Sequence, residues 1–308
     1  MMVMFIIEED EEKREQQKER ALKLARFYHE DGLYKDAVRS YKLYIFLNGK
    51  DNTSYEIYKD LGICYSLYGE NTKAISKLEK AYKLNKSDSG IIYLLAQMHE
   101  QNCNYKEAEE YYIKLITMDG TEKFAVFYSL GDIALRAGNV EKAIEYFKKV
   151  VEIQPTNSHA YFILGEILYQ YKKNLNDAEI YFRNAHENGL KRVAIYEYLG
   201  HIYLKQGIIE NAKVNFLIAA GKEEWAGSHY KNYLKCLNEI EIEKELKVME
   251  ELQDYDVNFF RVGLIELHRG NIEKAEKIFM ELDRKELTMN LKKSVRDELN
   301  GIQKNSKK

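Results

Sequence analysis

Residues 137–157 read AGNVEKAIEYFKKVVEIQPTN, and near copies of this stretch occur elsewhere in the chain. The segments QGIIENAKVNFLIAAG, from residue 206, and RGNIEKAEKIFMELD, from residue 269, follow the same pattern. Each has a glycine, an apolar residue shortly after it, a Lys or Asn directly before an alanine, and an aromatic residue four positions after that alanine. Such self-similarity indicates a repeat architecture, which has to be identified before local secondary structure is assigned.

The repeated alanine sets the period. Successive alanines are separated by 37, 34, 35, 35, 34 and 63 residues, and Leu246 lies 34 residues after the sixth one, inside the long last gap. The unit is therefore about 34 residues long, with one degenerate copy over residues 225–256. The aligned alanines are Ala37, Ala74, Ala108, Ala143, Ala178, Ala212 and Ala275.

A second small residue lies 12 or 13 positions before each alanine and predicts a helical hairpin. The aromatic residue before it and the tyrosine after it fall on one helical stripe with it. A glycine seven positions later can take the left-handed conformation that ends a helix. We expect the alanine to lie where the two helices of a unit approach most closely, with the following aromatic residue beside it. The small residues are Ala25, Gly62, Ala96, Gly131, Gly165, Gly200 and Gly263.

This pattern resembles the tetratricopeptide repeat (TPR) family. In the quoted unit Phe127, Leu130, Gly131, Ala143, Phe147 and Pro155 match that family, whereas Ala134 and Val150 depart from it. The unit around Ala212 matches at Tyr196, Leu199, Gly200, Tyr203, Phe216 and Ala219. The resemblance implies an all-α protein, a right-handed α-solenoid of stacked helix-turn-helix units in which the first helices line the inner surface.

The ends of the chain differ from the repeats. Residues 1–18 form a mixed-charge N-terminal segment, residues 19–285 an array of about eight units, and residues 286–308 a capping helix with a disordered basic tail from Gly301. The helix is expected because Leu287, Leu291, Val295 and Leu299 fall four apart, and a terminal helix covers the last repeat of a solenoid. The apolar start, Met1 to Ile7, is expected to fray or to pack on the first helix; a remnant of an upstream anchor is the alternative.

Composition excludes several classes of protein. The net charge of −3 gives no basic footprint for nucleic acid. Three cysteines without CxxC spacing favour reduced thiols in a cytoplasmic protein over a disulfide framework or a zinc site. No stretch approaches the roughly 20 apolar residues of a membrane span. A single proline, Pro155, is typical of a chain that is nearly all helix.

No catalytic, metal or cofactor motif is present in the sequence. None of the seven histidines lies in HExxH, and the P-loop, G-x-S-x-G and G-x-G-x-x-G patterns are missing. His99 takes the tyrosine position of its unit and is expected in the core. We therefore predict a protein that is not an enzyme and that binds no cofactor. Its predicted function is a protein-interaction scaffold that holds a peptide or helix of a partner; the alternative is a peptide-sensing regulatory subunit whose superhelix changes curvature.

The predicted binding face lies on the first helices, at positions three before and one after the small residue, joined by those six before and four after it. Across residues 90–204 this face carries four carboxylates, four aromatic residues and no Lys or Arg, and Tyr93, Tyr128 and Phe162 repeat at one position. We expect them to form a ladder that binds a basic and apolar segment. Two plainer interpretations remain: a tyrosine-rich chain simply places tyrosine here, or the ladder packs between repeats. The predicted binding residues are Tyr93, Gln97, Tyr128, Asp132, Phe162, Glu166, Tyr169, Glu197 and His201.

Chaperone-binding members of the family grip a C-terminal carboxylate with a clamp of Lys, Asn and Arg. At the matching positions this chain offers Leu22 and Arg26, Lys59 and Ile63, and then Tyr93 and Gln97. The clamp is therefore absent, and we expect no preference for a free C-terminal acid over its amide.

Overall fold

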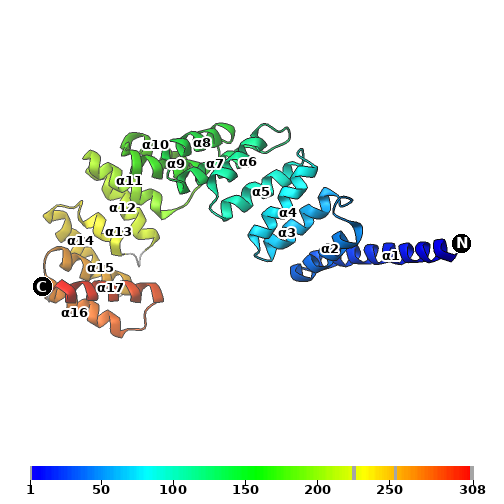
Figure 1. Cartoon of the computed structure of the whole chain (residues 1–308). Helices are drawn as coiled ribbons and strands as arrows, with labels where there is room; N and C mark the ends of the chain where they lie inside the picture. Colours follow the sequence, from blue (N-terminus) through cyan, green and yellow to red (C-terminus); the bar gives the residue numbers. More distant parts are fainter. Residues whose placement is uncertain (1, 224–226, 253–254, 306–308) are drawn as a thin grey trace. The chain divides into compact units, whose positions relative to one another are not determined.

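The chain is helical throughout the part that the structure describes (Figure 1). The computed structural model describes residues 2–223, 227–252 and 255–305, with side chains from residue 11 onward. Within these ranges there are seventeen α-helices, one π-helical turn and no strand. The all-α solenoid prediction is confirmed, while the right-handed sense of the superhelix stays a prediction. The helices form two compact bodies, Met1–Pro155 and Thr156–Lys308.

The N-terminal body contains four helical hairpins, and each of its helices packs against the next in chain order. The hairpins are α1 (Met2–Glu30) with α2 (Tyr34–Asn48), α3 (Tyr55–Leu67) with α4 (Asn71–Leu84), α5 (Ser89–Gln101) with α6 (Tyr105–Ile116), and α7 (Lys123–Arg136) with α8 (Val140–Ile153).

The C-terminal body continues the pattern and then departs from it. Its regular hairpins are α9 (Ser158–Ile167) with α10 (Leu175–Glu187), α11 (Val193–Gln206) with α12 (Ile209–Lys222), and α15 (Asp256–His268) with α16 (Ile272–Arg284). The π-helical turn η1 (Leu168–Lys172) extends α9. The remaining helices are α13 (Gly227–Leu234), α14 (Glu239–Glu251) and α17 (Met289–Asn305).

The first helix of a unit ends where the sequence predicted it. Five turn glycines have φ angles between 75° and 85°, in the left-handed region that favours glycine. The two units that lack this glycine still adopt the same backbone, since Cys103 has φ 59° and Lys173 has φ 52°. Lys173 is one residue late, and the π-helical turn before it accommodates the insertion, with the N–H of Asn174 donating to the carbonyl of Leu168 at 3.0 Å. The five glycines are Gly32, Gly69, Gly138, Gly207 and Gly270.

The two helices of a unit are in closest contact where an aromatic ring lies on a glycine. A Cβ atom added to Gly131 would lie 2.8 Å from Cε2 of Phe147, and one added to Gly200 would lie 2.7 Å from Cε1 of Phe216. Gly165 and Gly263 face Phe182 and Phe279 in the same way.

The alanines of the second helices are also fully buried, as predicted. The tightest constraint at the crossing, however, is on the glycine of the first helix and not on the alanine. The units with Ala25 and Ala96 at the glycine position carry Tyr41 and Tyr112 in place of phenylalanine.

The degenerate unit departs most from the common packing. Its first helix, α13, has only eight residues and packs on α12 and α15. The hydroxyls of Tyr230 and Tyr233 donate to the carboxylate of Glu245 on α14, at 2.6 and 3.4 Å. Leu246, which the repeat spacing identified, is buried in the core of this body. Part of the predicted degenerate segment, residues 225–226 and 253–254, lies outside the described residues.

The C-terminal end of the chain is helical further than the sequence predicted. Helix α17 buries Leu291 and Val295 and packs against α16, and it continues to Asn305. Residues 301–305 are therefore helical, which corrects the disordered tail predicted from Gly301. At the N-terminal side α1 begins at Met2, and the packing predicted for the apolar start concerns side chains outside the described residues.

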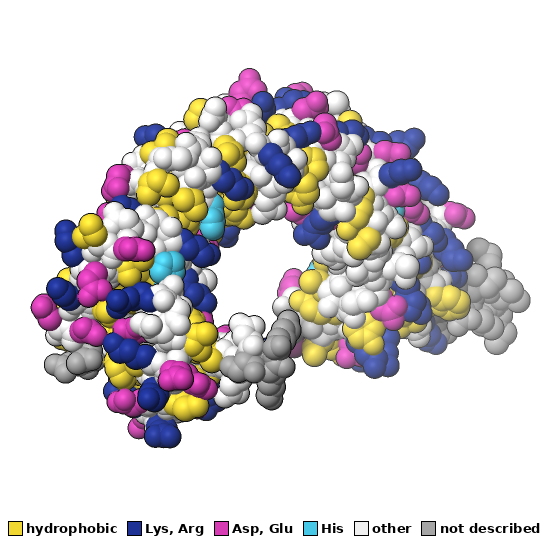
Figure 2. Space-filling model, turned by 90° about the vertical axis from the view of Figure 1, so that its left-hand side faces the viewer, with side chains coloured by type: hydrophobic (Ala, Val, Ile, Leu, Met, Phe, Trp, Pro, Cys, Tyr) yellow, Lys and Arg dark blue, Asp and Glu magenta, His cyan; other side chains and the backbone are white. Residues whose placement is uncertain are grey.

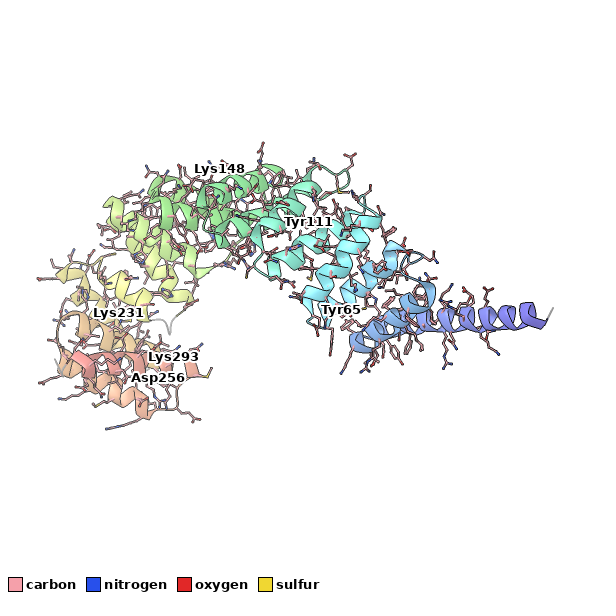
Figure 3. The ribbon with its side chains drawn as sticks, viewed as in Figure 1. Tyr65, Tyr111, Lys148, Lys231, Asp256 and Lys293 are labelled. Carbon is pink, nitrogen blue, oxygen red and sulfur yellow. The ribbon has the colours of Figure 1, made fainter. Side chains whose placement is uncertain are left out.

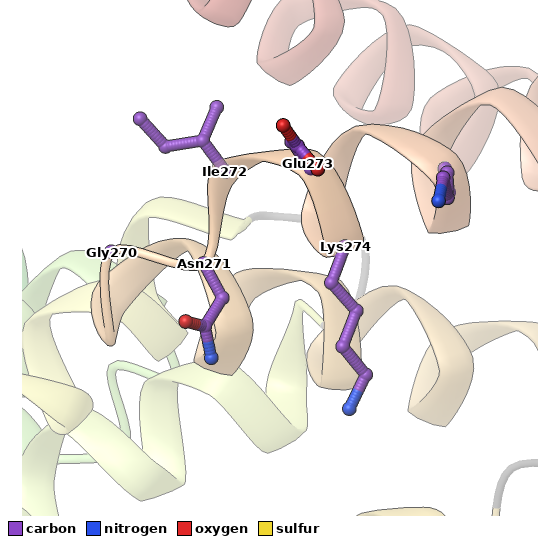
Figure 4. A pocket seen from close by; sticks show the side chains of 6 residues that line it. Gly270, Asn271, Ile272, Glu273 and Lys274 are labelled. Carbon is purple, nitrogen blue, oxygen red and sulfur yellow. The ribbon is translucent and has the colours of Figure 1, made fainter.

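A buried carboxylate ties the α15–α16 turn together. The side chain of Glu266 is 1% exposed and accepts hydrogen bonds from Nδ2 of Asn271 and Nζ of Lys274, both at 2.6 Å. Asn271 and Lys274 extend to the same side of the turn (Figure 4). Burial acts to raise the pKa of Glu266, but these two partners outweigh it and hold the pKa below its ordinary value. A buried charge with such partners is stabilised as an ion.

The crossing contact gives a stability prediction. Gly131→Val should lower the free energy of unfolding by about 1–3 kcal/mol or more, because the new side chain overlaps the Phe147 ring. Gly301→Val in α17 is the matched control, since a Cβ there meets nothing within 4 Å. Urea denaturation followed by circular dichroism measures both. Equal effects of the two substitutions would contradict the assignment of Gly131 to a tight crossing.

Candidate functional site

The nine predicted binding residues fall in two sets, one on each compact body. Tyr93, Gln97, Tyr128 and Asp132 lie on α5 and α7 of the N-terminal body. Phe162, Glu166, Tyr169, Glu197 and His201 lie on α9, η1 and α11 of the C-terminal body.

The repeated aromatic position makes the same contact in three successive units. Its ring lies edge-on to the aromatic ring of the second helix of its own unit, with interplanar angles between 64° and 88°. Such edge-to-face pairs are a favourable aromatic geometry. The pairs are Tyr93 with Tyr112 at 6.1 Å, Tyr128 with Phe147 at 5.3 Å, and Phe162 with Phe182 at 5.7 Å between ring centroids.

The three rings differ in what they expose. Tyr93 is 38% exposed, and its hydroxyl accepts a hydrogen bond from Nε2 of Gln97 at 3.0 Å. Phe162 is only 4% exposed, because Tyr198 packs against it and the guanidinium of Arg192 lies 5.1 Å from its ring centroid. The expectation that Phe162 presents an exposed anchor is therefore corrected: its ring is packed between two repeats.

A notch between α5 and α7 forms a cavity on this face. Its volume is about 280 Å³. Tyr93 and the small residues Gly90 and Ala125 belong to the face predicted from the repeat positions. Behind them the walls are apolar, since Leu115 and Val126 are both 2% exposed. Ser89, Thr121 and Glu122 complete the lining.

Sequence reasoning missed the polar part of this notch. The Oγ1 atom of Thr121 is buried and has no hydrogen-bond partner among the described residues. Thr121, Glu122 and Leu115 belong to the end of α6 and the loop before α7, outside the first helices that the repeat positions sampled. The sequence did contain a signal for the notch: Gly90 and Ala125 lie six residues before the small residues of their units. Two small side chains on neighbouring helices leave a gap.

The carboxylates of the predicted face are already paired, which corrects the expectation of an uncompensated acidic surface. Asp132 accepts from Nε of Arg136 at 2.8 Å. Glu166 accepts from the Tyr198 hydroxyl at 3.0 Å, and burial raises the pKa of this carboxyl although Tyr198 and Arg192 act in the opposite direction. Arg136 lies one residue after the predicted positions of its unit, and Arg192 lies two residues before those of its unit. Figure 2 likewise shows Lys and Arg interspersed with Asp and Glu.

Tyr169 illustrates the same compensation. Nζ of Lys205 donates to its hydroxyl at 3.1 Å and lies 4.4 Å from its ring centroid. This cation–π contact places a basic group on a face that carries no Lys or Arg at its own predicted positions. Tyr198 packs edge-on against the ring from the other side, at 5.2 Å.

Glu197 joins a partly buried charge cluster around the buried His229. Nδ1 of His229 lies 2.6 Å from Oε1 of Glu197, and Nε2 lies 3.2 Å from Oε2 of Glu223. The contact with Glu197 raises the pKa of His229, with a further contribution from Glu223 and against the effect of burial. His201, one turn along α11 from Glu197, packs edge-on against Phe216 at 5.0 Å, and burial lowers the pKa of its ring.

The positions of the carboxylate clamp are also occupied by other contacts. Nζ of Lys59, the cation nearest to the clamp pattern, donates to Oδ2 of Asp88 at 3.0 Å. Asp88 in turn caps α5 by accepting from the N–H of Ile91. The absence of a preference for a free C-terminal acid stays a prediction.

The described residues offer neither a cluster of metal ligands nor a helix that could span a membrane. Among the described residues no group of three His, Cys, Asp or Glu side chains is arranged to hold a metal ion. In the same ranges no helix combines the length and apolar character needed to cross a membrane.

Comparison with known proteins gives matches in sequence. The family described as "Cilia and flagella-associated protein 70 middle TPR-like domain" matches residues 92–217. The chain is 26% identical over 122 residues to anaphase-promoting complex subunit 3 of Schizosaccharomyces pombe. The matched segment is 39% of this chain and 18% of that protein. It is 29% identical over 137 residues to BBSome complex member BBS4 of Bos taurus. That matched segment is 44% of this chain and 25% of the relative. The matches thus span a quarter or less of these relatives.

Solved structures show the same fold. A tetratricopeptide repeat protein from Parabacteroides merdae superposes with a TM-score of 0.51 at 15% identity, covering 94% of this chain and 99% of that one. The structure titled Naa15/Naa10 bound to HypK-THB gives a TM-score of 0.57 at 14% identity, covering 95% of this chain and 50% of that one. Likeness at these identities concerns the fold alone.

The His229 cluster gives a pH prediction. The folded-state pKa of His229 lies above its value of about 6.5 in an unfolded chain. Its ion pairs therefore stabilise the protein below that pH, and this contribution is lost as the pH rises through the folded-state pKa. His229→Gln should lower the free energy of unfolding by about 1–3 kcal/mol at pH 6 and by less at pH 9.

The exposed His159 provides the control for this measurement, made by urea denaturation at both pH values. His159→Gln should have little effect at either pH. A cost of His229→Gln that is the same at pH 6 and pH 9 would show that the imidazolium contributes nothing.

Proposed function

We propose that this chain, a tetratricopeptide repeat protein, is a non-enzymatic protein-interaction scaffold that binds a peptide or helical segment of a partner on its first helices. Its two curated relatives are named as members of multi-subunit complexes, which supports a role in an assembly. Because the matches span only part of those proteins, their own partners are not carried over.

The notch between α5 and α7 is the observation that carries this proposal. It joins a half-exposed tyrosine, Tyr93, to apolar walls formed by Leu115 and Val126. A concave apolar pocket with a few polar groups is the usual form of a binding site, and an anchor side chain in such a pocket dominates an interface. Thr121 adds an unpaired hydroxyl that a partner's backbone could satisfy. The occupant we propose is one apolar side chain of the partner segment.

The partner segment is proposed to be basic as well as apolar. One acidic residue, Glu122, supports its basic character, whereas the sequence pointed to several carboxylates. Asp132 and Glu166 are engaged by other groups of this chain. Glu122, at the rim of the notch, is exposed and makes no ion pair among the described residues. A Lys or Arg beside the apolar anchor would pair with Glu122, and such an exposed pair contributes about 0–1 kcal/mol. The apolar anchor therefore supplies most of the affinity, and added salt should weaken binding only modestly.

Filling the notch tests the proposal. Ala125→Phe places a ring in the cavity and should reduce capture of native partners by about tenfold or more, because the anchor side chain is then excluded. Ala137→Phe, at the exposed end of α7, is the matched control and should capture normally. The tagged full-length chain is incubated with native extract, and bound proteins are quantified by mass spectrometry.

The outcome is interpreted together with the melting temperature, which both variants should keep within a few degrees of the wild type. If Ala125→Phe is folded and still captures the same partners in the same amounts, the notch is not the binding site. The peptide-sensing alternative is separated by small-angle scattering: only a sensor would change its radius of gyration when the partner peptide binds.

A further inference from the structure

A second cavity lies in the N-terminal body, lined by α2, the loop after α2, α3 and α4, and it shares no lining residue with the notch. Its volume is about 280 Å³. Apolar side chains form part of its wall: Ile45 is half-buried, and Leu61 and Tyr58 are 0% and 4% exposed. Phe46, 77% exposed, lies at the rim. We call this cavity the lysine pocket because its other lining residues are Lys42, Gly49, Lys50, Lys77 and Lys80.

The four lysines of the pocket have no carboxylate among the residues that line it. Within the described part of the chain none of them makes an ion pair, although Lys59, Lys142 and Lys274 each pair with an acidic side chain. The chain as a whole carries three more acidic than basic residues, 50 against 47. The concentration of positive charge is therefore local to this pocket.

This arrangement has an energetic cost in the unliganded protein. Burial lowers the pKa of Lys77, and the neighbouring Lys80, Lys42 and Lys50 lower it further. Like charges held together destabilise a fold, and such clusters with perturbed pKa values are concentrated at functional sites. An anion placed among the four ammonium groups would remove this repulsion.

Structural roles account for only part of the cluster. Lys50 follows the C-terminus of α2, where a cation interacts favourably with the helix dipole. Nζ of Lys80 lies 5.7 Å from the ring centroid of Tyr58. Burial raises the pKa of Tyr58, and the charge of Asp51, next to Lys50 in the chain, raises it further. Lys42 and Lys77, in the middle of their helices, have no such partner among the described residues.

The geometry points to a binding site for a phosphate monoester carried on an aromatic or apolar body. A phosphate dianion can be shared by several lysines, which bind it as point charges. The apolar wall and the exposed Phe46 ring would cover the body of the ligand. The lysines surround a cavity and not a flat surface, which favours a compact phosphate ester over an acidic membrane. This chemistry is found both in a phosphorylated tyrosine side chain and in a free nucleotide.

The site is rigidly held, which suits a preformed pocket. The hydroxyl of Tyr58 donates to the carbonyl of Lys50 at 3.2 Å. Oγ1 of Thr53 donates to the carbonyl of Gly49 at 2.7 Å, and Gly49 itself takes the left-handed conformation with φ 82°. The loop that carries Lys50 is thereby fixed against α3, so little conformational entropy has to be lost on binding.

Isothermal titration of the full chain with phenyl phosphate tests this proposal. Phenyl phosphate should bind, inorganic phosphate should bind more weakly, and benzyl alcohol should not bind. The double variant Lys77→Gln with Lys80→Gln should weaken phenyl phosphate binding by about tenfold or more. Its melting temperature should not fall, because the substitutions relieve repulsion. Phe46→Ala should weaken binding of phenyl phosphate more than binding of inorganic phosphate.

A charge-matched control separates the pocket from general electrostatics. Lys148→Gln with Lys293→Gln also removes two positive charges, here from exposed side chains far from the pocket in sequence, and should leave binding unchanged. Both lysines are labelled in Figure 3. Equal weakening by both double variants, or no heat from phenyl phosphate at millimolar concentration, overturns the proposal. Binding to phosphatidylserine vesicles without binding to phenyl phosphate overturns it as well.

Two further ligands distinguish the source of the phosphate ester. Tighter binding of a phosphotyrosine peptide than of adenosine monophosphate would identify a phosphorylated protein, and the reverse order would identify a nucleotide. Both outcomes support the pocket. Neither depends on the notch between α5 and α7, so Ala125→Phe should leave them unchanged.

Discussion

The contact between an aromatic ring of the second helix and a glycine of the first helix is the constraint on which four of the units depend. The rings of Phe147, Phe182, Phe216 and Phe279 are fully buried, and each lies where a Cβ on the opposing glycine would be less than 3 Å away. Such a contact fixes how closely and at which residue the helices cross. The faces that the pair presents to its neighbours follow from that crossing, and stacking of the pairs then buries what one hairpin leaves exposed.

The same crossing positions the candidate site. Because Phe147 and Phe182 are held against glycine, their ring faces are available to Tyr128 and Phe162, which pack edge-on from the first helix. The aromatic face is thus coupled to the core. Where the following helix supplies a tyrosine and an arginine, as Tyr198 and Arg192 do at Phe162, the ring is covered. Where it supplies small residues, as at Tyr93, a notch remains open.

The sequence predicted what the repeat period controls. Turn glycines and buried alanines follow from spacing, since backbone conformation recurs with the repeat. It could not predict the pairing of Asp132 with Arg136 or the burial of Phe162, because long side chains reach one turn or one helix away from their own position. Nor did spacing reveal the lysine pocket, whose four lysines come from second helices and a loop that the repeat pattern leaves unspecified.

A double-mutant cycle on Gly165 and Phe182 tests the central contact most directly. Gly165→Val should destabilise the wild type by about 1–3 kcal/mol, because its side chain overlaps the Phe182 ring. In a Phe182→Val background the nearest ring atoms, Cδ1 and Cε1, are absent, so the same substitution should cost much less. Urea denaturation of the four proteins gives the coupling energy, which we predict to be about 1–3 kcal/mol. An equal cost of Gly165→Val in both backgrounds would contradict the account.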